Sequence, residues 1–175
     1  MKTTDTQMAD AILEQMEREA PRTRRVLEQV PEGRDDWKPH DKSMPLGRLA
    51  NLVAMMPSWA AMIVGQDELD VMPKEGPSAE YSKQARTRAE LLEAHEKAME
   101  QARAALKTAS DEHLMKTWKL LASGKVVGED PRHTVLEDTM GHLAHHRGQL
   151  TVYLRMNDAM VPSVYGPTAD DPRFA

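Results

Sequence analysis

Apolar residues recur every three to four positions in four long stretches of the chain, a spacing that gathers them on one face of an α-helix. These stretches predict four helices at about Thr6–Val30, Met44–Val64, Tyr81–Ser110 and Pro131–Asn157. No stretch alternates strictly enough to predict a strand. Residues 111–130 are ambiguous, since they allow a short extended segment that ends at glycine turns. The pattern therefore predicts an all-α protein.

Proline, serine and glycine mark where these helices begin, bend and end. Pro21 interrupts the first helix, and we expect a kink or a break there because its ring removes a backbone donor. Ser43 is expected to be the N-cap of the second helix, with Pro45 in the first turn. Gly65 suits the C-cap of that helix, and Asp130 the N-cap of the last one.

Four helices of this length, joined by loops, predict a four-helix bundle. The 175 residues fit one domain that spans 1–175. The last residues, about 158–175, contain three prolines and no periodicity, so they are predicted to form a coil over the bundle. Thirteen methionines, against three Trp, three Tyr and one Phe, predict a Met-rich aliphatic core.

Charge and composition exclude several classes of protein. A net charge of −5 gives no basic footprint for nucleic acid. The absence of cysteine excludes disulfides, thiolate zinc sites and a cysteine nucleophile. No long apolar run is present, and residues 1–20 lack the apolar segment of a signal peptide. We therefore expect a cytoplasmic protein that binds neither nucleic acid nor membrane.

The last predicted helix carries three of the seven histidines within five residues, namely His142, His145 and His146. At about 100° per residue, His142 and His146 lie about 40° apart and aim at one point, as helical zinc sites require. Both border the predicted buried face, whereas His145 faces solvent or a partner. Such a pair is more often hydrogen-bonded structure than a metal site, because a stable site wants a third ligand from another helix.

Three segments resemble those of a known family. The H-x3-H-R-G-Q core of HLAHHRGQLTVYLR (142–155) resembles the last-helix motif of the DinB/YfiT-like superfamily, and residues 36–51 and 161–171 agree in order and spacing. The resemblance implies an up-down-down-up bundle with a long crossover connection that commonly dimerises. It also implies a divalent metal, zinc or nickel, held by His142, His146 and a second-helix histidine. Some members of this superfamily are thiol-dependent S-transferases or isomerases.

The second-helix histidine is missing from this chain. The family pattern there resembles L-A-x-H-[VIL]-A, whereas residues 49–54 read LANLVA and place Leu52 at the ligand position. A leucine cannot coordinate a cation. Asp138, one turn before His142, could supply an oxygen, although its angle on the helix leans toward solvent. The weaker substitutes are Asn51, Met55, Met56, Gln149 and the loop histidine His40.

Two hypotheses follow. In the first, the chain is a divergent metalloprotein, a divalent-metal-dependent transferase or hydrolase whose two-histidine site is completed by Asp138, water or a substrate atom. An external thiol would then be its co-substrate. In the second, it is a metal-free module for dimerisation or for a small molecule, which would bind in a pocket lined by Leu52, Met56 and Trp59. A homodimer is expected under both, and neither identifies a substrate.

Five further residues carry structural expectations. His95, His113 and His133 lie among polar neighbours and are interpreted as surface residues. Arg147 is expected to form a salt bridge with a neighbouring helix. Gly148 is expected to permit a close helix approach, either within the bundle or across a dimer.

Overall fold

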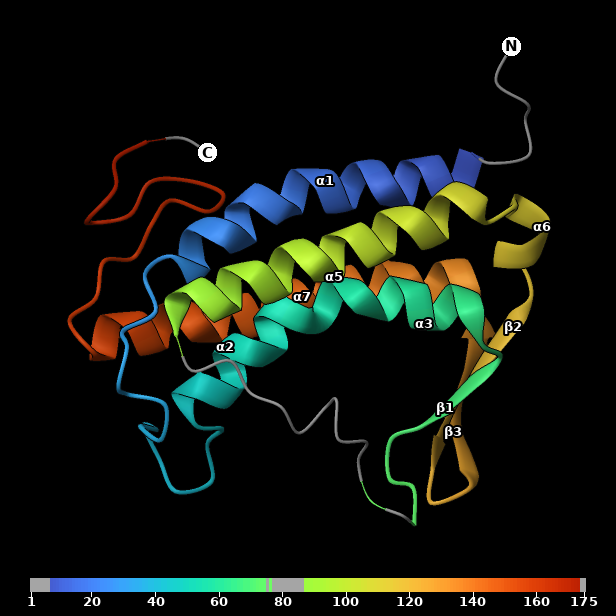
Figure 1. Cartoon of the computed structure of the whole chain (residues 1–175), viewed down its shortest axis with the longest axis horizontal. Coiled ribbons are helices and arrows are strands. Elements are labelled where there is room, and N and C mark those ends of the chain that lie inside the picture. The colour runs from blue at the N-terminus through green and yellow to red at the C-terminus, as the bar shows by residue number, and fades with distance from the viewer. Residues whose placement is uncertain (1–6, 75, 77–86, 174–175) are drawn as a thin grey trace.

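The computed structural model describes residues 7–74, 76 and 87–173, and these are mostly helical (Figure 1). The elements, in chain order, are α1 (Gln7–Leu27), α2 (Leu46–Met55), the 3-10 helix η2 (Met56–Ser58), α3 (Trp59–Gly65), β1 (Glu68–Asp70), α5 (Arg88–Thr108), α6 (Asp111–Leu114), β2 (Thr117–Ala122), β3 (Lys125–Pro131) and α7 (Arg132–Met156).

The long helices pack side by side around an apolar interior. Helix α1 contacts both α5 and α7, and α2 and α3 contact the same two helices from another side (Figure 1). The interior is aliphatic and rich in methionine, with Met16, Met56, Met99 and Met140 all buried. Each large apolar side chain buried in this way stabilises the fold by about 1.5–3 kcal/mol. The predicted Met-rich core is confirmed.

The prediction of an all-α fold is confirmed only in part, because the mostly helical chain also contains a small sheet. The ambiguous segment forms an antiparallel hairpin, β2–β3, and β1 pairs in parallel with β2 to complete a small mixed sheet. Ser123 and Gly124, with φ of 53° and 77°, form the turn. The hairpin projects from the helices (Figure 1), and β3 leaves Val126 and Val127 exposed. Trp118 and Leu120 of β2 and Leu69 of β1 pack against the core, but β1 is only three residues long and β3 is mostly exposed. These two strands therefore lack a run of alternating apolar and polar residues by which strands are identified in a sequence.

Proline shapes the helices differently from the prediction. The second predicted helix is divided into α2, η2 and α3, because Pro57 has no N–H to continue the α-helical hydrogen bonds. Helix α1 continues through Pro21, so of the predicted kink or break the break is absent, and the kink stays a prediction. Pro45, not Ser43, is the N-cap of α2, and no side chain caps it. The backbone N–H groups of Leu46 and Gly47 instead donate to the carbonyl oxygens of Trp37 and Asp35 in the preceding loop, so this terminus needs no side-chain cap.

Two other predicted helix caps are shifted by one residue each. The N-cap of α7 is Pro131, because Asp130 is still paired within β3. Gly65 is the last residue of α3 and Gln66 is its C-cap. The predicted start of the third helix at Tyr81 lies outside the described residues. In the described part, α5 begins after a capping box formed by Thr87 and Glu90.

Buried arginine Arg132 fixes the sheet to the helices. Its guanidinium donates to the backbone carbonyls of Ile63, Lys116, Thr117 and Gln66, and pairs with a carboxylate oxygen of the exposed Asp67. A buried guanidinium is tolerated because all of its donors have partners. The arginine therefore joins the end of α3 to the start of β2 and of α7.

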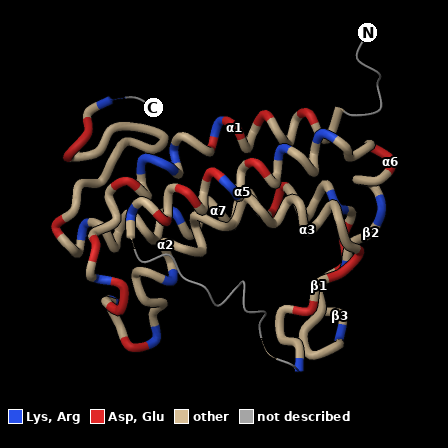
Figure 2. Tube along the Cα trace, viewed as in Figure 1, with Lys and Arg blue, Asp and Glu red and all other residues tan. Residues whose placement is uncertain are grey.

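Acidic and basic residues are interspersed along α1 and α5 (Figure 2). Several form pairs, such as Arg18 with Glu14 within α1, and Arg103 of α5 with Glu17 of α1 at 2.6 Å. Within the described ranges, one helical run, Leu46–Gly65, has the length and composition to cross a membrane, and half of it is buried inside the fold. Core helices of soluble proteins share these properties, so the absence of a membrane span stays a prediction.

Candidate metal-binding site on helix α7

Helix α7 brings His142 and His146 together. Their Nε2 atoms are 2.9 Å apart and their ring centroids 4.7 Å apart. One helical turn separates the two residues, so the helix backbone itself supplies this convergence. Two ring nitrogens thus meet at one point on the surface of the helix.

Gln149, one turn further along α7, contacts the other nitrogen of His146. Its Oε1 atom is 2.8 Å from Nδ1 of His146. In the sequence this residue was considered only as a weak metal donor. In the structure it holds the far side of a candidate ligand, which is the position of the outer-shell acceptors that orient metal-binding histidines.

His142 lies between the core and solvent. Its ring meets the indole of Trp59 edge-on, with centroids 5.5 Å apart. Partial burial, with a smaller effect of the neighbouring His146 and His145, lowers the pKa of His142 below its usual value. Neutral imidazole is the form that binds a metal.

The other predicted members of the site do not join the pair. Leu52 lies on α2, half-buried against the apolar core, and offers no donor atom. Asp138 is exposed, and no interaction between its carboxylate and the two histidines is present in the described residues. Within 7–74, 76 and 87–173, no group of three or more His, Cys, Asp or Glu side chains is placed to hold a metal.

The pair itself fits two positions of a metal site. In tetrahedral zinc sites, with Zn–N bonds of about 2.0–2.1 Å, two nitrogen ligands lie about 3.3 Å apart. The observed 2.9 Å between the Nε2 atoms needs a movement of only a few tenths of an ångström to match. The pair therefore offers two imidazole nitrogens from one helix at nearly the spacing of two zinc ligands.

A model of the DinB family matches residues 1–173 of the chain. The chain belongs to the DinB family. Its fold is similar to that of a DinB-like protein from Bacillus cereus, with a TM-score of 0.70, 18% identity, and coverage of 89% of this chain and 97% of that one. It is also similar to that of a DinB-like protein from Bacillus subtilis, with a TM-score of 0.62, 19% identity, and coverage of 86% of this chain and 94% of that one. None of the curated proteins searched matches the chain.

The remaining substitutes considered for this DinB site lie elsewhere or offer little. His40 stays within its loop, where Nδ1 accepts from the backbone N–H of Lys42. Met56 is completely buried in the core. His145 is exposed beside His146, with ring centroids 5.1 Å apart and the two rings in a T-shaped arrangement. Its expected exposure is confirmed.

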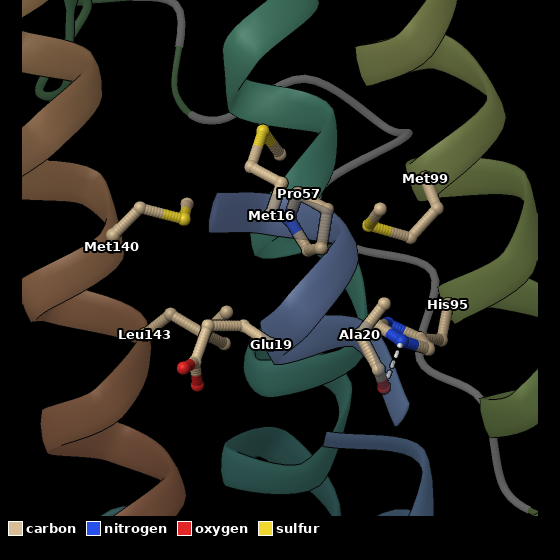
Figure 3. A pocket seen from close by; sticks show the side chains of 8 residues that line it. All are labelled: Met16, Glu19, Ala20, Pro57, His95, Met99, Met140 and Leu143. Atoms are coloured by element: carbon tan, nitrogen blue, oxygen red, sulfur yellow. Dashed lines mark hydrogen bonds between the residues drawn. The ribbon is translucent and has the colours of Figure 1, made fainter. Parts of the chain in front are cut away.

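The interpretation of His95 as a surface residue is wrong, since only 2% of it is exposed. Its Nε2 atom is 3.2 Å from the Ala20 carbonyl oxygen (Figure 3), and Nδ1 is buried with no hydrogen-bond partner among the residues that the structure describes. Burial lowers the pKa of His95. The signal was present in the sequence, because His95 falls at helical spacing on the stripe that includes Leu91 and Ala98.

The space around His95 lies inside the DinB fold, between α1, α5, α7 and the Pro57 bend (Figure 3). The methionines Met16, Met99 and Met140 line it and fill it so closely that a water molecule does not fit. This interior space is therefore packed core. The predicted small-molecule pocket, described with Leu52, Met56 and Trp59, stays a prediction.

The expected salt bridge of Arg147 is confirmed. The buried guanidinium lies 2.5 Å from the Glu19 carboxylate of α1 and also contacts Thr23 and Tyr165. Burial opposes ionisation of Glu19, but the hydrogen bonds from Arg147, Tyr165 and Arg22 outweigh it and lower its pKa.

Gly148 is exposed with open space around it, so a close approach within the described fold is absent. Its expected place at a dimer contact stays a prediction.

Two other histidines are only partly exposed. His113 lies 2.8 Å from the Val64 carbonyl through its Nε2 atom, and His133 faces Glu137 one turn along α7. Neither approaches the His142–His146 pair by an interaction in the described residues. The candidate site of this DinB protein thus consists of His142, His146 and Gln149, with Trp59 against its inner edge.

Proposed function

We propose that this DinB family protein binds one divalent transition-metal ion, zinc or nickel, through His142 and His146, and that exchangeable ligands complete the coordination. The observation that carries the proposal is the 2.9 Å approach of the two Nε2 atoms at the rim of the fold. Partial exposure of both histidines supports it, because water, Asp138 or a substrate atom can then reach the remaining positions.

The residues around the pair favour a reactive rather than a structural site. Structural zinc sites use four protein ligands, whereas catalytic sites leave a position open. A bound metal with open positions would lower the pKa of a bound water or thiol and polarise a substrate oxygen. The chain has no cysteine, so the thiol would be an external co-substrate. The proposed activity is therefore a divalent-metal-dependent transfer or hydrolysis.

Within this proposal each residue has a defined part. His142 and His146 hold the ion, and Trp59 packs against the His142 ring and limits its rotation. Leu52, at the position where the family motif has a histidine, offers no donor atom, which leaves more of the coordination sphere to exchangeable ligands than three histidines would. The proposal further includes an up-down-down-up bundle, a homodimer and a cytoplasmic location.

Metal content by elemental mass spectrometry, on untagged protein purified without chelator, tests the proposal. We expect about one metal ion per chain, and its loss in His146→Ala. His145→Ala is the matched control, because it removes an adjacent exposed histidine of the same helix and should keep the metal. Leu52→His should bind the ion more tightly than the parent, since it adds a third imidazole from α2.

The metal-free alternative has its own supporting observation. A hydrogen bond between His142 and His146 already satisfies both Nε2 atoms, and Leu52 supplies no third ligand. A parent chain without metal, together with a Leu52→His variant that holds about one ion, would contradict the metal proposal. It would favour a binding or dimerisation module built on the same fold.

A further inference from the structure

We propose that Gln149 is a positioning residue that fixes the tautomer of His146. His146 then has the tautomer that a metal ion needs before the ion binds, whereas His142 must change its tautomer on binding. The part of this inference that concerns the metal-bound protein rests on the proposed function. The part that concerns the tautomers of the metal-free protein depends only on the contacts of three side chains, His142, His146 and Gln149.

The first step is the hydrogen bond between Gln149 and His146. The amide oxygen Oε1 of Gln149 is 2.8 Å from Nδ1 of His146, and a carbonyl oxygen can only accept. Nδ1 of His146 therefore carries the proton. A neutral imidazole has one N–H, so Nε2 of His146 presents a lone pair.

The second step is the contact between the two rings. Nε2 of His142 is 2.9 Å from the Nε2 lone pair of His146, a distance at which one of the two nitrogens must donate. His146 has already used its single N–H on Gln149. His142 is therefore protonated at Nε2 in the metal-free protein, and the neighbouring histidines have opposite tautomers.

The third step concerns metal binding. Both Nε2 atoms must offer lone pairs to a metal ion, and His146 does so already. His142 must lose the Nε2 proton to solvent and take up a proton at Nδ1, so that the ring stays neutral and the proton count is unchanged. In the metal-bound protein the ion would take the place of the bridging proton, and only His142 would have changed its tautomer.

The chemistry of Gln149 suits this part. A neutral amide orients His146 without the added negative charge that a carboxylate would bring to the ring. Its place three residues after His146 on the same helix puts the two side chains in contact by helical geometry alone. Gln149 is exposed, so replacing it should leave the packing of the core unchanged.

The test is nitrogen-15 NMR of the histidine rings in metal-free protein at a pH well above their pKa values. We expect His146 protonated at Nδ1 and His142 at Nε2, and we expect zinc to move only the His142 proton to Nδ1. Gln149→Met removes the acceptor and should leave His146 as a mixture of tautomers, with zinc affinity lower by about tenfold. Gln149→Glu keeps the acceptor and should restore the parent tautomer.

Gln101→Met, a change at an exposed glutamine of α5, is the matched control and should alter neither the tautomers nor the affinity. A His146 ring protonated at Nε2 in the parent, or unchanged in Gln149→Met, would overturn the inference even if zinc binds. Absence of zinc binding in every variant would overturn the proposed function and the metal-bound half. The tautomers of the metal-free protein would still decide the role of Gln149.

Discussion

The histidines of this chain differ in burial and in hydrogen-bond partners because they lie in different parts of the fold. His142 and His146 meet at the surface of α7, whereas His95 lies in the centre of the fold against the Ala20 carbonyl. The approach of His142 and His146 was predictable, since side chains at positions i and i+4 lie close together on any helix. The buried state of His95 was less evident, because the charged neighbours Glu93 and Glu96 obscured the apolar stripe on which it falls.

Burial of His95 should make the stability of the protein depend on pH. Its pKa is lowered in the folded state, so below about pH 6.5 the unfolded chain binds a proton that the folded chain resists. The free energy of unfolding should therefore fall as the pH drops through this range, by at most about 1.4 kcal/mol per pH unit for this one group. Urea unfolding between pH 8 and pH 5 measures it.

Two variants isolate this contribution from that of other groups. His95→Gln removes the buried titration and should flatten the fall in stability below pH 6.5 relative to the parent, whatever its effect at pH 8. His133→Gln, at a partly exposed histidine of α7, should leave the pH profile of the parent in place. An equal pH dependence in His95→Gln and parent would contradict the assignment.

Helices and strands are joined in this protein by buried arginines as well as by apolar contact. Arg132 links the sheet to α3 and α7, and Arg147 links α7 to α1 and to Tyr165 of the C-terminal coil. The sequence allowed the prediction that Arg147 forms a salt bridge with another helix, but it did not identify Glu19 as the partner. Their separation of 128 residues in the chain gives no local signal.

Arg147→Met should destabilise the fold by about 1.5–3 kcal/mol, because it removes the buried charged hydrogen bonds to Glu19 and Thr23 and leaves Arg22 as the remaining cation beside the Glu19 carboxylate. Thermal or urea unfolding measures the loss. Arg18→Met is the comparison, since Arg18 forms an exposed pair with Glu14 one turn away and should cost under about 0.5 kcal/mol. A similar small effect for both changes would show that the Arg147 pair adds little to stability.

The strands of the sheet are the elements that the hydrophobic periodicity of the sequence did not predict. Three residues of β1 pair with β2 across a wide gap in the sequence, and β3 has exposed residues on both sides. Short strands of this kind depend on residues distant in the sequence, since hydrogen bonds between strands and the contacts of Trp118 and Leu120 with the core hold them in place. The long amphipathic helices carry their own signal, so most of their extent was predicted.

At the scale of the whole molecule, the proposed homodimer has one helical face that suits it. Gly141, His145, Gly148 and Val152 are exposed on α7 at spacings of three and four residues, and therefore share one side of the helix. Open space surrounds both glycines, so a second helix can come close there.

Light scattering at micromolar concentration should give twice the mass of the 19.7 kDa chain. Gly148→Arg should yield monomers, because it places a long charged side chain in this face, whereas Ala104→Arg on the exposed side of α5 should leave the dimer intact. A monomeric parent would contradict the proposed dimer. A dimeric Gly148→Arg variant would assign the interface to another face.

The sequence by itself determined the properties that depend on local geometry: mostly helical structure, a Met-rich interior and two histidines that converge one turn apart on α7. It also carried the motifs of the DinB family, because these lie in short continuous segments. The tertiary structure decided what depends on distant residues: the strand pairing, the burial of His95, the Arg147–Glu19 pair and the absence of a third ligand near His142 and His146 in the described part of the chain. Such contacts follow from how the helices pack, and helical periodicity predicts which face is buried but not which residue of another element lies against it.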